Sequence, residues 1–204
     1  MLSTEKEQID FCTEFNISGE KFRNSRLTWE ELDQIADDFE RKRNEHRNTV
    51  MQYAEVLQKC LGVHSLSYRV KDTKHLIEKI IRKNPKYLEA GNALCLDNYE
   101  QEITDLMGIR ILLLFKEDWL NIHNYLMERY KTVLLEEPFA YVREGDDTHL
   151  YENKIKIRKE KPYRSVHYVI RADKGLAIEI QVRTLYEEAW SEIDHKLRYP
   201  YNLT

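Results

Sequence analysis

The stretch that organises the chain is Ala177-Ile178-Glu179-Ile180-Gln181-Val182-Arg183. Its β-branched residues alternate with polar ones, and a period of two is typical of a strand that buries one face. The β-branched side chains should therefore face a core, while Glu179 and its polar neighbours line the opposite face of a sheet. The common explanation of such a polar row is a face exposed to solvent.

Two other stretches repeat this arrangement and favour a functional site over a solvated face. In Ser165-Val166-His167-Tyr168-Val169-Ile170-Arg171, polar residues again alternate with residues suited to a core. In Asp105-Leu106-Met107-Gly108-Ile109-Arg110, a carboxylate and a guanidinium bracket the entry to the apolar run 111–115. Three strands that each offer charged or imidazole groups predict one shared site.

The composition is that of a globular protein with a sizeable core. Its 204 residues suit one large domain, or a domain with a helical extension. A formal net charge of -4 argues against a cationic surface for duplex nucleic acid. The 3 cysteines lack CxxC spacing, which speaks against disulfides or a thiolate zinc site and favours a reducing, cytoplasmic location. The charged N-terminal residues and the short apolar runs predict neither a signal peptide nor a membrane span.

A helical region is predicted over residues 1–62. Thr28-Trp29-Glu30-Glu31 is a capping box, in which the threonine and the last glutamate bond to each other's backbone amides. Apolar residues then recur at spacings of three and four along one long helix, although the charged run 41–47 interrupts them. Residues 63–204 are the expected second domain.

Strands and helices alternate in this second region. The patterns predict a strand at 65–71, a helix at 74–83 that ends at Asn84-Pro85, a strand at 109–115, a helix at 117–130, strands at 133–142, 165–171 and 176–183, and a last helix packed through Tyr186, Trp190, Ile193 and Leu197. This order favours an α+β fold with a mixed sheet covered by helices. The sequence has no GxGxxG or GxxxxGKS/T motif, so neither a Rossmann nor a P-loop nucleotide site is expected.

Cations cluster around the first predicted strand. At 100° per residue, His75, Lys79 and Arg82 fall opposite the apolar stripe of the helix that follows it. Arg69 and Lys71 come from the strand itself. Together these groups are suited to hold a polyphosphate, although an ordinary basic helix surface is the simpler explanation of the helix alone.

Asp105 and Glu179 offer a carboxylate pair for magnesium. Mg²⁺ prefers octahedral oxygen coordination and is commonly held by one or two carboxylates together with substrate phosphates. Transfer of a phosphoryl-type group depends chiefly on positioning and on neutralising the developing charge. Lysines and arginines around a carboxylate-bound metal are therefore the expected parts of the site.

Five motifs occur in the order found in the synthetase domains of the RelA/SpoT alarmone family. They are Arg69-Val70-Lys71, Asp105-Leu106-Met107-Gly108-Ile109-Arg110, Tyr163-Arg164-Ser165-Val166-His167, Glu179-Ile180-Gln181-Val182-Arg183-Thr184 and Ala189-Trp190-Ser191-Glu192-Ile193-Asp194-His195-Lys196-Leu197-Arg198-Tyr199. Over roughly residues 45–200 the chain resembles the small, single-domain synthetases. The resemblance implies a nucleotidyltransferase-like mixed β-sheet flanked by helices, with an N-terminal helical extension here. It also implies transfer of pyrophosphate from ATP to the ribose 3′-hydroxyl of GDP or GTP.

The resemblance gives each matching position an expected role. Asp105 would bind Mg²⁺, and Glu179 would share the metal or accept the proton of the attacking hydroxyl. The implied ATP-binding residues are Arg69, Lys71 and Lys79, and the implied acceptor-binding residues are Lys159, Tyr163, His167 and Gln181. Tyr163 would stack on the acceptor base. For His167, a core histidine with satisfied hydrogen bonds is the alternative interpretation.

Two departures from the family pattern leave the substrate preference open. His75 stands where serine is frequent, and Lys161-Pro162 replaces the Asn-Gly that often precedes the stacking tyrosine. One alternative is modification of the tRNA 3′ end by a toxic small synthetase, which the basic run 154–164 would support. The other is a nucleotide-sensing module without catalysis, against which the intact carboxylate pair argues. The oligomeric state also stays open, with a homo-oligomer as one possibility.

Overall fold

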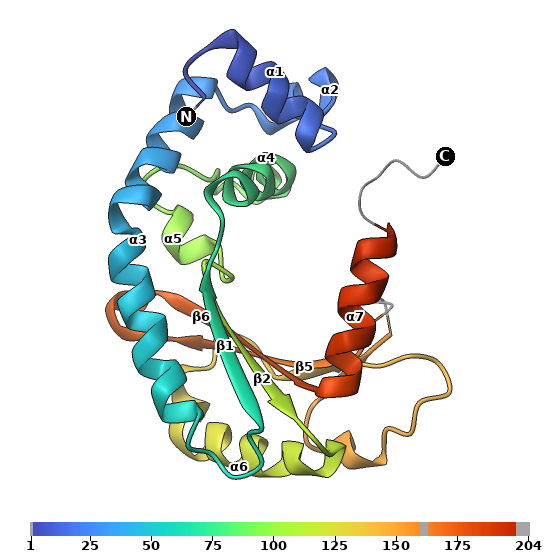
Figure 1. Cartoon of the computed structure of the whole chain (residues 1–204). Helices are drawn as coiled ribbons and strands as arrows, with labels where there is room; N and C mark the ends of the chain where they lie inside the picture. Colours follow the sequence, from blue (N-terminus) through green and yellow to red (C-terminus); the bar gives the residue numbers. More distant parts are fainter. Residues whose placement is uncertain (1, 160–162, 199–204) are drawn as a thin grey trace.

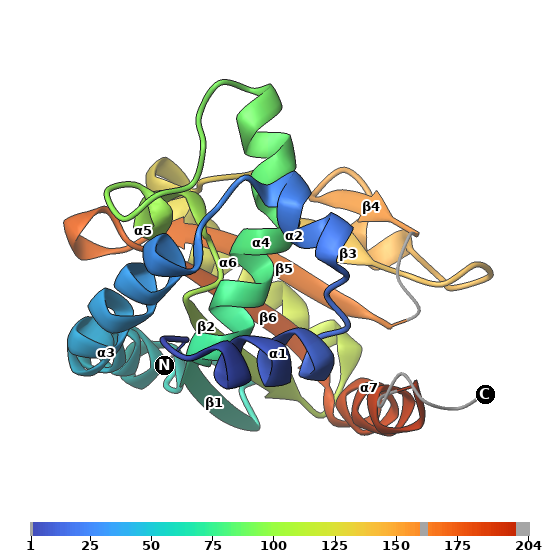
Figure 2. The same cartoon turned by 90° about the horizontal axis from the view of Figure 1, so that it is seen from above.

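A six-stranded mixed sheet forms the centre of the protein (Figures 1 and 2). The computed structural model describes residues 2–159 and 163–198, the last four of these without their side chains. The strands lie in the order β1-β2-β6-β5-β3-β4. Their bounds are Ser65–Val70 (β1), Met107–Leu113 (β2), Phe139–Tyr141 (β3), Lys156–Arg158 (β4), Ser165–Arg171 (β5) and Ala177–Thr184 (β6). The pairs β2–β6 and β3–β4 are parallel, and the other neighbours are antiparallel.

Helices flank this sheet, which confirms the predicted α+β fold. In the described residues they are α1 (Glu5–Glu14), α2 (Gly19–Ser25), α3 (Trp29–Leu57), α4 (Thr73–Glu89), α5 (Tyr99–Glu102), α6 (Trp119–Tyr130) and α7 (Leu185–Arg198). Short 3-10 helices span Lys116–Asp118, Lys131–Val133, His149–Tyr151 and Asp173–Gly175. None of the helices in the described ranges has both the length and the apolar character needed to cross a bilayer.

The register of the central strands gathers polar residues on one face of the sheet. Glu179 on β6 lies opposite Gly108 on β2. Gln181, two residues further on, lies opposite Arg110 on β2 and His167 on β5. Residues in register point to the same face, so these side chains share one polar surface. The other face packs against α6 and the second half of α3 in an apolar core that includes Ile178, Ile180 and Val182, as predicted.

A second core joins the helices before β1 to α4 and α5. Its members include Phe11 of α1, Leu32, Ile35 and Phe39 of α3, Leu76 and Ile80 of α4, and Tyr99 of α5. Helix α3 spans both cores, and Figure 1 shows it running along one side of the molecule from α1 to α6. The boundary between residues 62 and 63 stays a prediction, because α4, which follows it, completes the core of the helices that precede it.

The cap at the start of α3 confirms the predicted capping box. Thr28 Oγ1 accepts a hydrogen bond from the Glu31 amide at 3.2 Å, and the Glu31 carboxylate accepts one from the Thr28 amide at 2.7 Å. These bonds satisfy amides that would otherwise lack a partner at a helix N-terminus. The long helix therefore begins where the local sequence favours it.

Helix α4 continues through Pro85, whereas the sequence predicts its end at Asn84-Pro85. Proline removes a helical hydrogen bond and disfavours a helical conformation in the residue before it. The buried Asn84 offsets this loss, because its Nδ2 donates to the Ser25 carbonyl at 2.8 Å and its Oδ1 accepts from the Leu94 amide at 2.7 Å. Tertiary contacts thus extend the helix beyond the point that local sequence indicates.

The strand predicted over residues 133–142 is confirmed only at Phe139–Tyr141. Pro138, directly before it, has no amide hydrogen to donate to a neighbouring strand. Leu134 makes an isolated bridge with Ile170 and no continuous ladder. The apolar pattern of this stretch therefore overstates the length of the strand.

The last helix is confirmed, but its predicted packing face is wrong. Tyr186, Trp190 and Ile193 are 75%, 41% and 55% exposed, and Leu197 lies among the side chains outside the description. Helical periodicity shows that such side chains share a face, but it does not show what covers that face. The contacts that join α7 to the sheet are largely ionic, and they belong to the site.

Candidate active site

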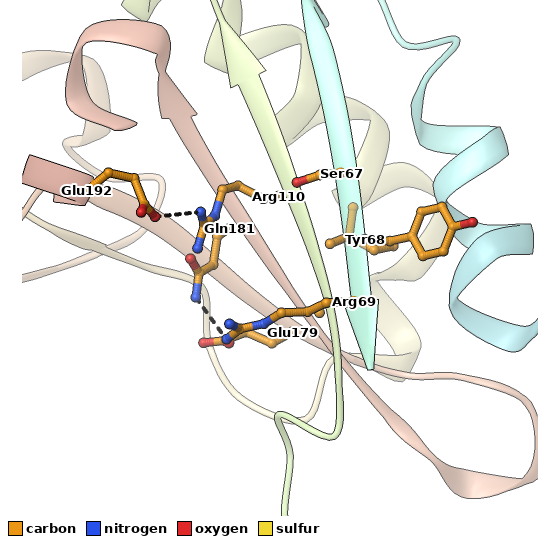
Figure 3. Close-up of a pocket in the computed structure, with 9 residues that line it drawn as sticks. Ser67, Tyr68, Arg69, Arg110, Glu179, Gln181 and Glu192 are labelled. Carbon is orange, nitrogen blue, oxygen red and sulfur yellow. Dashed lines mark hydrogen bonds and ion pairs between the residues drawn. The ribbon is translucent and has the colours of Figure 1, made fainter. Parts of the chain in front are cut away.

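The polar face of the sheet carries the candidate active site. Strands β1, β2 and β6 and helix α7 form a pocket of about 180 Å³, whose lining includes Ser67, Arg69, Arg110, Glu179, Gln181 and Glu192 (Figure 3). The Arg69 side chain extends from β1 across β2, where its Cγ and Nε lie 3.6 Å from the position a Cβ on Gly108 would take. Because Gly108 has no side chain, the Arg69 side chain can pass over β2 at this position.

Asp105, two residues before β2, is held by two lysines. Lys71 Nζ lies 3.0 Å and Lys79 Nζ 2.7 Å from its Oδ2. Burial opposes ionisation of this carboxyl, but the charges of Lys79 and Lys71 outweigh burial and keep the pKa of Asp105 below its usual value. The other oxygen, Oδ1, is buried and has no hydrogen-bond partner among the described residues. An unpaired buried acceptor of this kind is suited to a ligand.

Lys83 is a third cation near this carboxylate and was not predicted as a site residue. It lies one turn after Lys79 on α4. Burial and then repulsion from Lys79 lower the pKa of its ammonium group, whereas Asp105 acts in the opposite direction. The spacing of four residues was the available signal, because residues four apart share one face of a helix. Three lysines around one carboxylate leave a positive excess suited to phosphate groups.

Glu179 is held by two neighbours on the polar face. His167 Nδ1 lies 3.1 Å from Oε1, and Gln181 Nε2 donates to Oε2 at 3.1 Å. Burial and the charge of Asp105 oppose ionisation of Glu179, but the hydrogen bond and charge of His167 outweigh them and keep its pKa below the usual value. Since an ionised carboxylate can only accept, His167 Nδ1 is the donor.

His167 therefore differs from a core histidine with satisfied hydrogen bonds. Its side chain is buried, yet Nε2 has no partner among the described residues. Phe139 stacks on its ring at a centroid distance of 5.0 Å, and Tyr141 meets it edge-on at 5.1 Å. The imidazole is held by packing on one side and by Glu179 on the other, and one nitrogen is left for a ligand.

Tyr163 lies beside these rings. Its ring meets Tyr141 edge-on at 5.5 Å, and the Arg183 guanidinium lies 5.0 Å from its centre. Aromatic rings and guanidinium groups both offer planar faces on which a base can stack. The structure thus brings Tyr163, His167 and Gln181 close together, and their roles stay predictions.

Helix α7 contributes Glu188, which bridges two arginines of the sheet and was not predicted as a site residue. Its carboxylate accepts from Arg110 Nη1 and, at 3.0 Å, from Arg183 Nη1. Arg183 also donates to Ser191 Oγ at 3.0 Å and to Gln181 Oε1 at 3.1 Å. Burial and then repulsion from Arg110 lower the pKa of Arg183, and Glu188 opposes that effect.

Two predicted features lie apart from these contacts. Lys159 is exposed, directly after β4, and no described hydrogen bond or ion pair joins it to the other candidate residues. His75 is exposed on α4, where its Nδ1 lies 3.1 Å from the Asp72 carboxylate. The Lys161-Pro162 departure lies outside the described residues. The role of Lys159 therefore stays a prediction.

The chain belongs to the RelA/SpoT family. A family model described as a region found in RelA / SpoT proteins matches residues 68–204. The chain is similar to two curated proteins of Bacillus subtilis (strain 168), the GTP pyrophosphokinases YwaC, 27% identical over 143 residues, and YjbM, 28% identical over 141 residues. Each match covers 66% of this chain but only 57% and 56% of the two relatives, a little more than half their length.

Solved structures show the same fold. The small alarmone synthetase 1 from Bacillus subtilis bound to its product pppGpp superposes with a TM-score of 0.54 at 22% identity, covering 82% of this chain and 84% of that one. The same protein bound to AMPCPP gives a TM-score of 0.53 at 21% identity, covering 81% and 79%. The family and the fold that the motifs predict are therefore confirmed.

Proposed function

We propose that the protein is a (p)ppGpp synthetase, a GTP pyrophosphokinase-type transferase that moves pyrophosphate from ATP to the 3′-hydroxyl of GDP or GTP. The observation that carries the proposal is the polar face itself. It holds two carboxylates, Asp105 among lysines and Glu179 bonded to His167. Arginines lie on one side of them, in the pocket of Arg69 and Arg110, and Arg183 with the Tyr163 ring lies on the other. The names of the relatives, both GTP pyrophosphokinases, support it.

ATP as the donor suits the β1 side of the face. Its adenine would enter the pocket that Arg69 and Arg110 line, because planar guanidinium groups stack on bases. Its phosphates would contact Lys71, Lys79 and Lys83. These three positive charges exceed the single negative charge of Asp105, so a net positive charge is left for the phosphates. The AMPCPP complex of the structural relative also supports an adenine nucleotide.

Asp105 and Glu179 are the residues that would hold Mg²⁺. Asp105 Oδ1 is buried and unpaired among the described residues, and carboxylate oxygens are ligands that this ion prefers. The described ranges contain no cluster of three or more metal-ligating side chains, so phosphate oxygens and water would complete the coordination, as is usual for Mg²⁺. When bound, the ion supplies positive charge against the charge that develops on the phosphates.

Glu179 would accept the proton of the attacking hydroxyl. The acceptor 3′-oxygen forms a bond to the β-phosphorus of ATP, the bond from that phosphorus to the α–β bridging oxygen breaks, and AMP leaves. The hydroxyl proton passes to the Glu179 carboxylate, which its lowered pKa keeps ionised near neutral pH. His167 holds this carboxylate through Nδ1, so that the base is in place before the acceptor arrives.

GDP or GTP as the acceptor suits the β5 side of the face. Tyr163 offers a ring for guanine, and the Arg183 guanidinium beside that ring keeps it in place. His167 and Gln181 lie between this ring and Glu179 along the register of β5 and β6, and Lys159 would contact the acceptor phosphates. We expect the reaction to take place in the cytoplasm, where both nucleotides are available.

A transfer assay tests the proposal. The protein is incubated with Mg²⁺, ATP labelled at the γ-phosphate, and GDP, GTP or deacylated tRNA in separate reactions. We expect label in ppGpp or pppGpp, with AMP as the second product. Label at the tRNA 3′ end alone would assign the toxic alternative, and no labelled acceptor at all would leave only the nucleotide-sensing module.

A further inference from the structure

Charged groups join helix α7 to the active-site face. Tyr186, Trp190 and Ile193 of this helix are exposed, so apolar packing of its described side chains contributes little to its attachment. Glu188 supplies the principal contact, because its 15% exposed side chain reaches Arg110 on β2 and Arg183 on β6. Among the described residues, Glu188 is therefore the carboxylate that contacts both arginines and ties them to the helix.

The two arginines belong to different halves of the site. Arg110 lines the pocket that we assign to the donor base. Arg183 lies against the Tyr163 ring, which we assign to the acceptor base, and its Nη2 donates to Gln181 Oε1 at 3.1 Å. Glu188 thus fixes one cation of each half.

These arginines need a shared counter-ion. Arg183 is only 6% exposed, and a buried cation that loses its partner is strongly disfavoured. The charge of Arg110 acts against that of Arg183, so the two guanidinium groups repel each other where no anion lies between them. Arg110 has a second partner in Glu192 at 3.3 Å, but that side chain is 54% exposed and its contact is weaker.

We propose that Glu188 is a positioning residue that sets Arg110 and Arg183 for nucleotide binding and thereby couples the donor and acceptor pockets. It acts through the arginines and touches neither substrate. A nucleotide that contacts one arginine weakens or strengthens the bond between that arginine and Glu188, and this changes how firmly Glu188 holds the other arginine. ATP should therefore alter the affinity for the acceptor, and the acceptor should alter the affinity for ATP by the same factor. The assignment of the two pockets rests on the proposed function.

Glu188→Gln tests this role, with Glu187→Gln as the matched control. Glutamine keeps the size of the side chain but removes the charge and one of the two acceptor oxygens, so one arginine is released. Glu187 is the preceding residue of α7. It accepts from the Thr184 amide at 2.8 Å, and no described hydrogen bond or ion pair joins it to either arginine. Both substitutions remove one negative charge from the same turn.

The readout is the dissociation constant of a fluorescent GDP analogue, titrated with and without saturating AMPCPP and Mg²⁺. We expect AMPCPP to change GDP affinity about fivefold or more in the wild type, and to have no effect in Glu188→Gln. Glu187→Gln should keep the wild-type coupling. In turnover, Glu188→Gln should raise KM for both nucleotides more than it lowers kcat, which a loss of folded protein would not do.

Three results would overturn the proposal. They are wild-type coupling in folded Glu188→Gln, an equal loss of coupling in Glu187→Gln, and no coupling in the wild type. If Glu188→Gln does not fold, Glu188→Asp replaces it, because a carboxylate one methylene shorter cannot hold both arginines; wild-type coupling there would also contradict the proposal. A wild type that couples the two nucleotides but yields no labelled product would remove the proposed transferase activity and leave the positioning role standing.

Discussion

Asp105 and Glu179 are both kept ionised, but by partners of different kinds. Lysines of the β1–α4 segment neutralise Asp105, whereas His167 and Gln181 hold Glu179 by hydrogen bonds within the sheet. Asp105 keeps one buried oxygen, Oδ1, that has no partner among the described residues and is open to a cation. Both oxygens of Glu179 accept hydrogen bonds, and this carboxylate lies beside His167 and Gln181, where the attacking hydroxyl of the proposed acceptor would arrive. This difference is why we assign the metal chiefly to Asp105 and the proton to Glu179.

The pH dependence of activity tests the contact between His167 and Glu179. In the wild type Glu179 stays ionised down to a pKa below its usual value, so activity is lost only as the pH falls through that low pKa. His167→Phe keeps the stacking on Phe139 but removes the hydrogen bond, and burial then raises the pKa of Glu179. The acidic limb of kcat/KM against pH should therefore move to higher pH. An unmoved limb in an active variant would mean that another group titrates.

In the proposed function, the acceptor pocket depends on Tyr163. Tyr163→Phe should keep most of the activity, because the ring face survives. Tyr163→Ala should lose about 1–3 kcal/mol of acceptor binding, the usual contribution of base–aromatic stacking. Separate affinities for ATP and GDP and the melting temperature distinguish the roles, since an Ala variant that melts early with unchanged GDP affinity would make Tyr163 structural.

At the scale of elements, the capping box of α3 offers the simplest test of a sequence-encoded boundary. Thr28→Ala removes the acceptor for the Glu31 amide and should lower the free energy of unfolding by about 1 kcal/mol. Glu31→Gln is the control, because glutamine can complete the same box. Chemical denaturation measures both. Equal stability of Thr28→Ala and the wild type would mean that tertiary packing alone fixes this end of the helix.

The spacing of polar and apolar residues predicted those elements that depend on their own residues alone. Strands β5 and β6 alternate so regularly that the polar face, with His167, Glu179 and Gln181, could be predicted from spacing alone. The continuation of α4 past Pro85 could not, because it depends on contacts of Asn84 with distant backbone. The exposed face of α7 and the bridge from Glu188 also depend on which element packs opposite the helix. Short stretches of the sequence carry no information about that neighbour.

At the scale of the whole molecule, the site lies where the two cores meet. The sheet core presents β2, β5 and β6, while the helical core positions α4 and with it Lys79 and Lys83. Of the lysines near Asp105, Lys79 and Lys83 therefore come from a helix of the helical core and Lys71 from the segment between β1 and α4, whereas the Glu179 side belongs to the sheet. Both cores have to form before the residues proposed to bind donor and acceptor lie in one site.

The central claim is that this face transfers pyrophosphate, and one comparison tests it most directly. Wild type, Asp105→Asn and Glu179→Gln are assayed side by side for labelled ppGpp formed from ATP and GDP with Mg²⁺, and their melting temperatures are recorded. We predict labelled ppGpp from the wild type and a loss of at least about a hundredfold in each variant, with melting temperatures that show a folded protein. Glu179→Gln removes the general base, which alone contributes about that much, and Asp105→Asn removes a charge that the proposed metal site needs. Turnover at the wild-type rate by either folded variant would contradict the account.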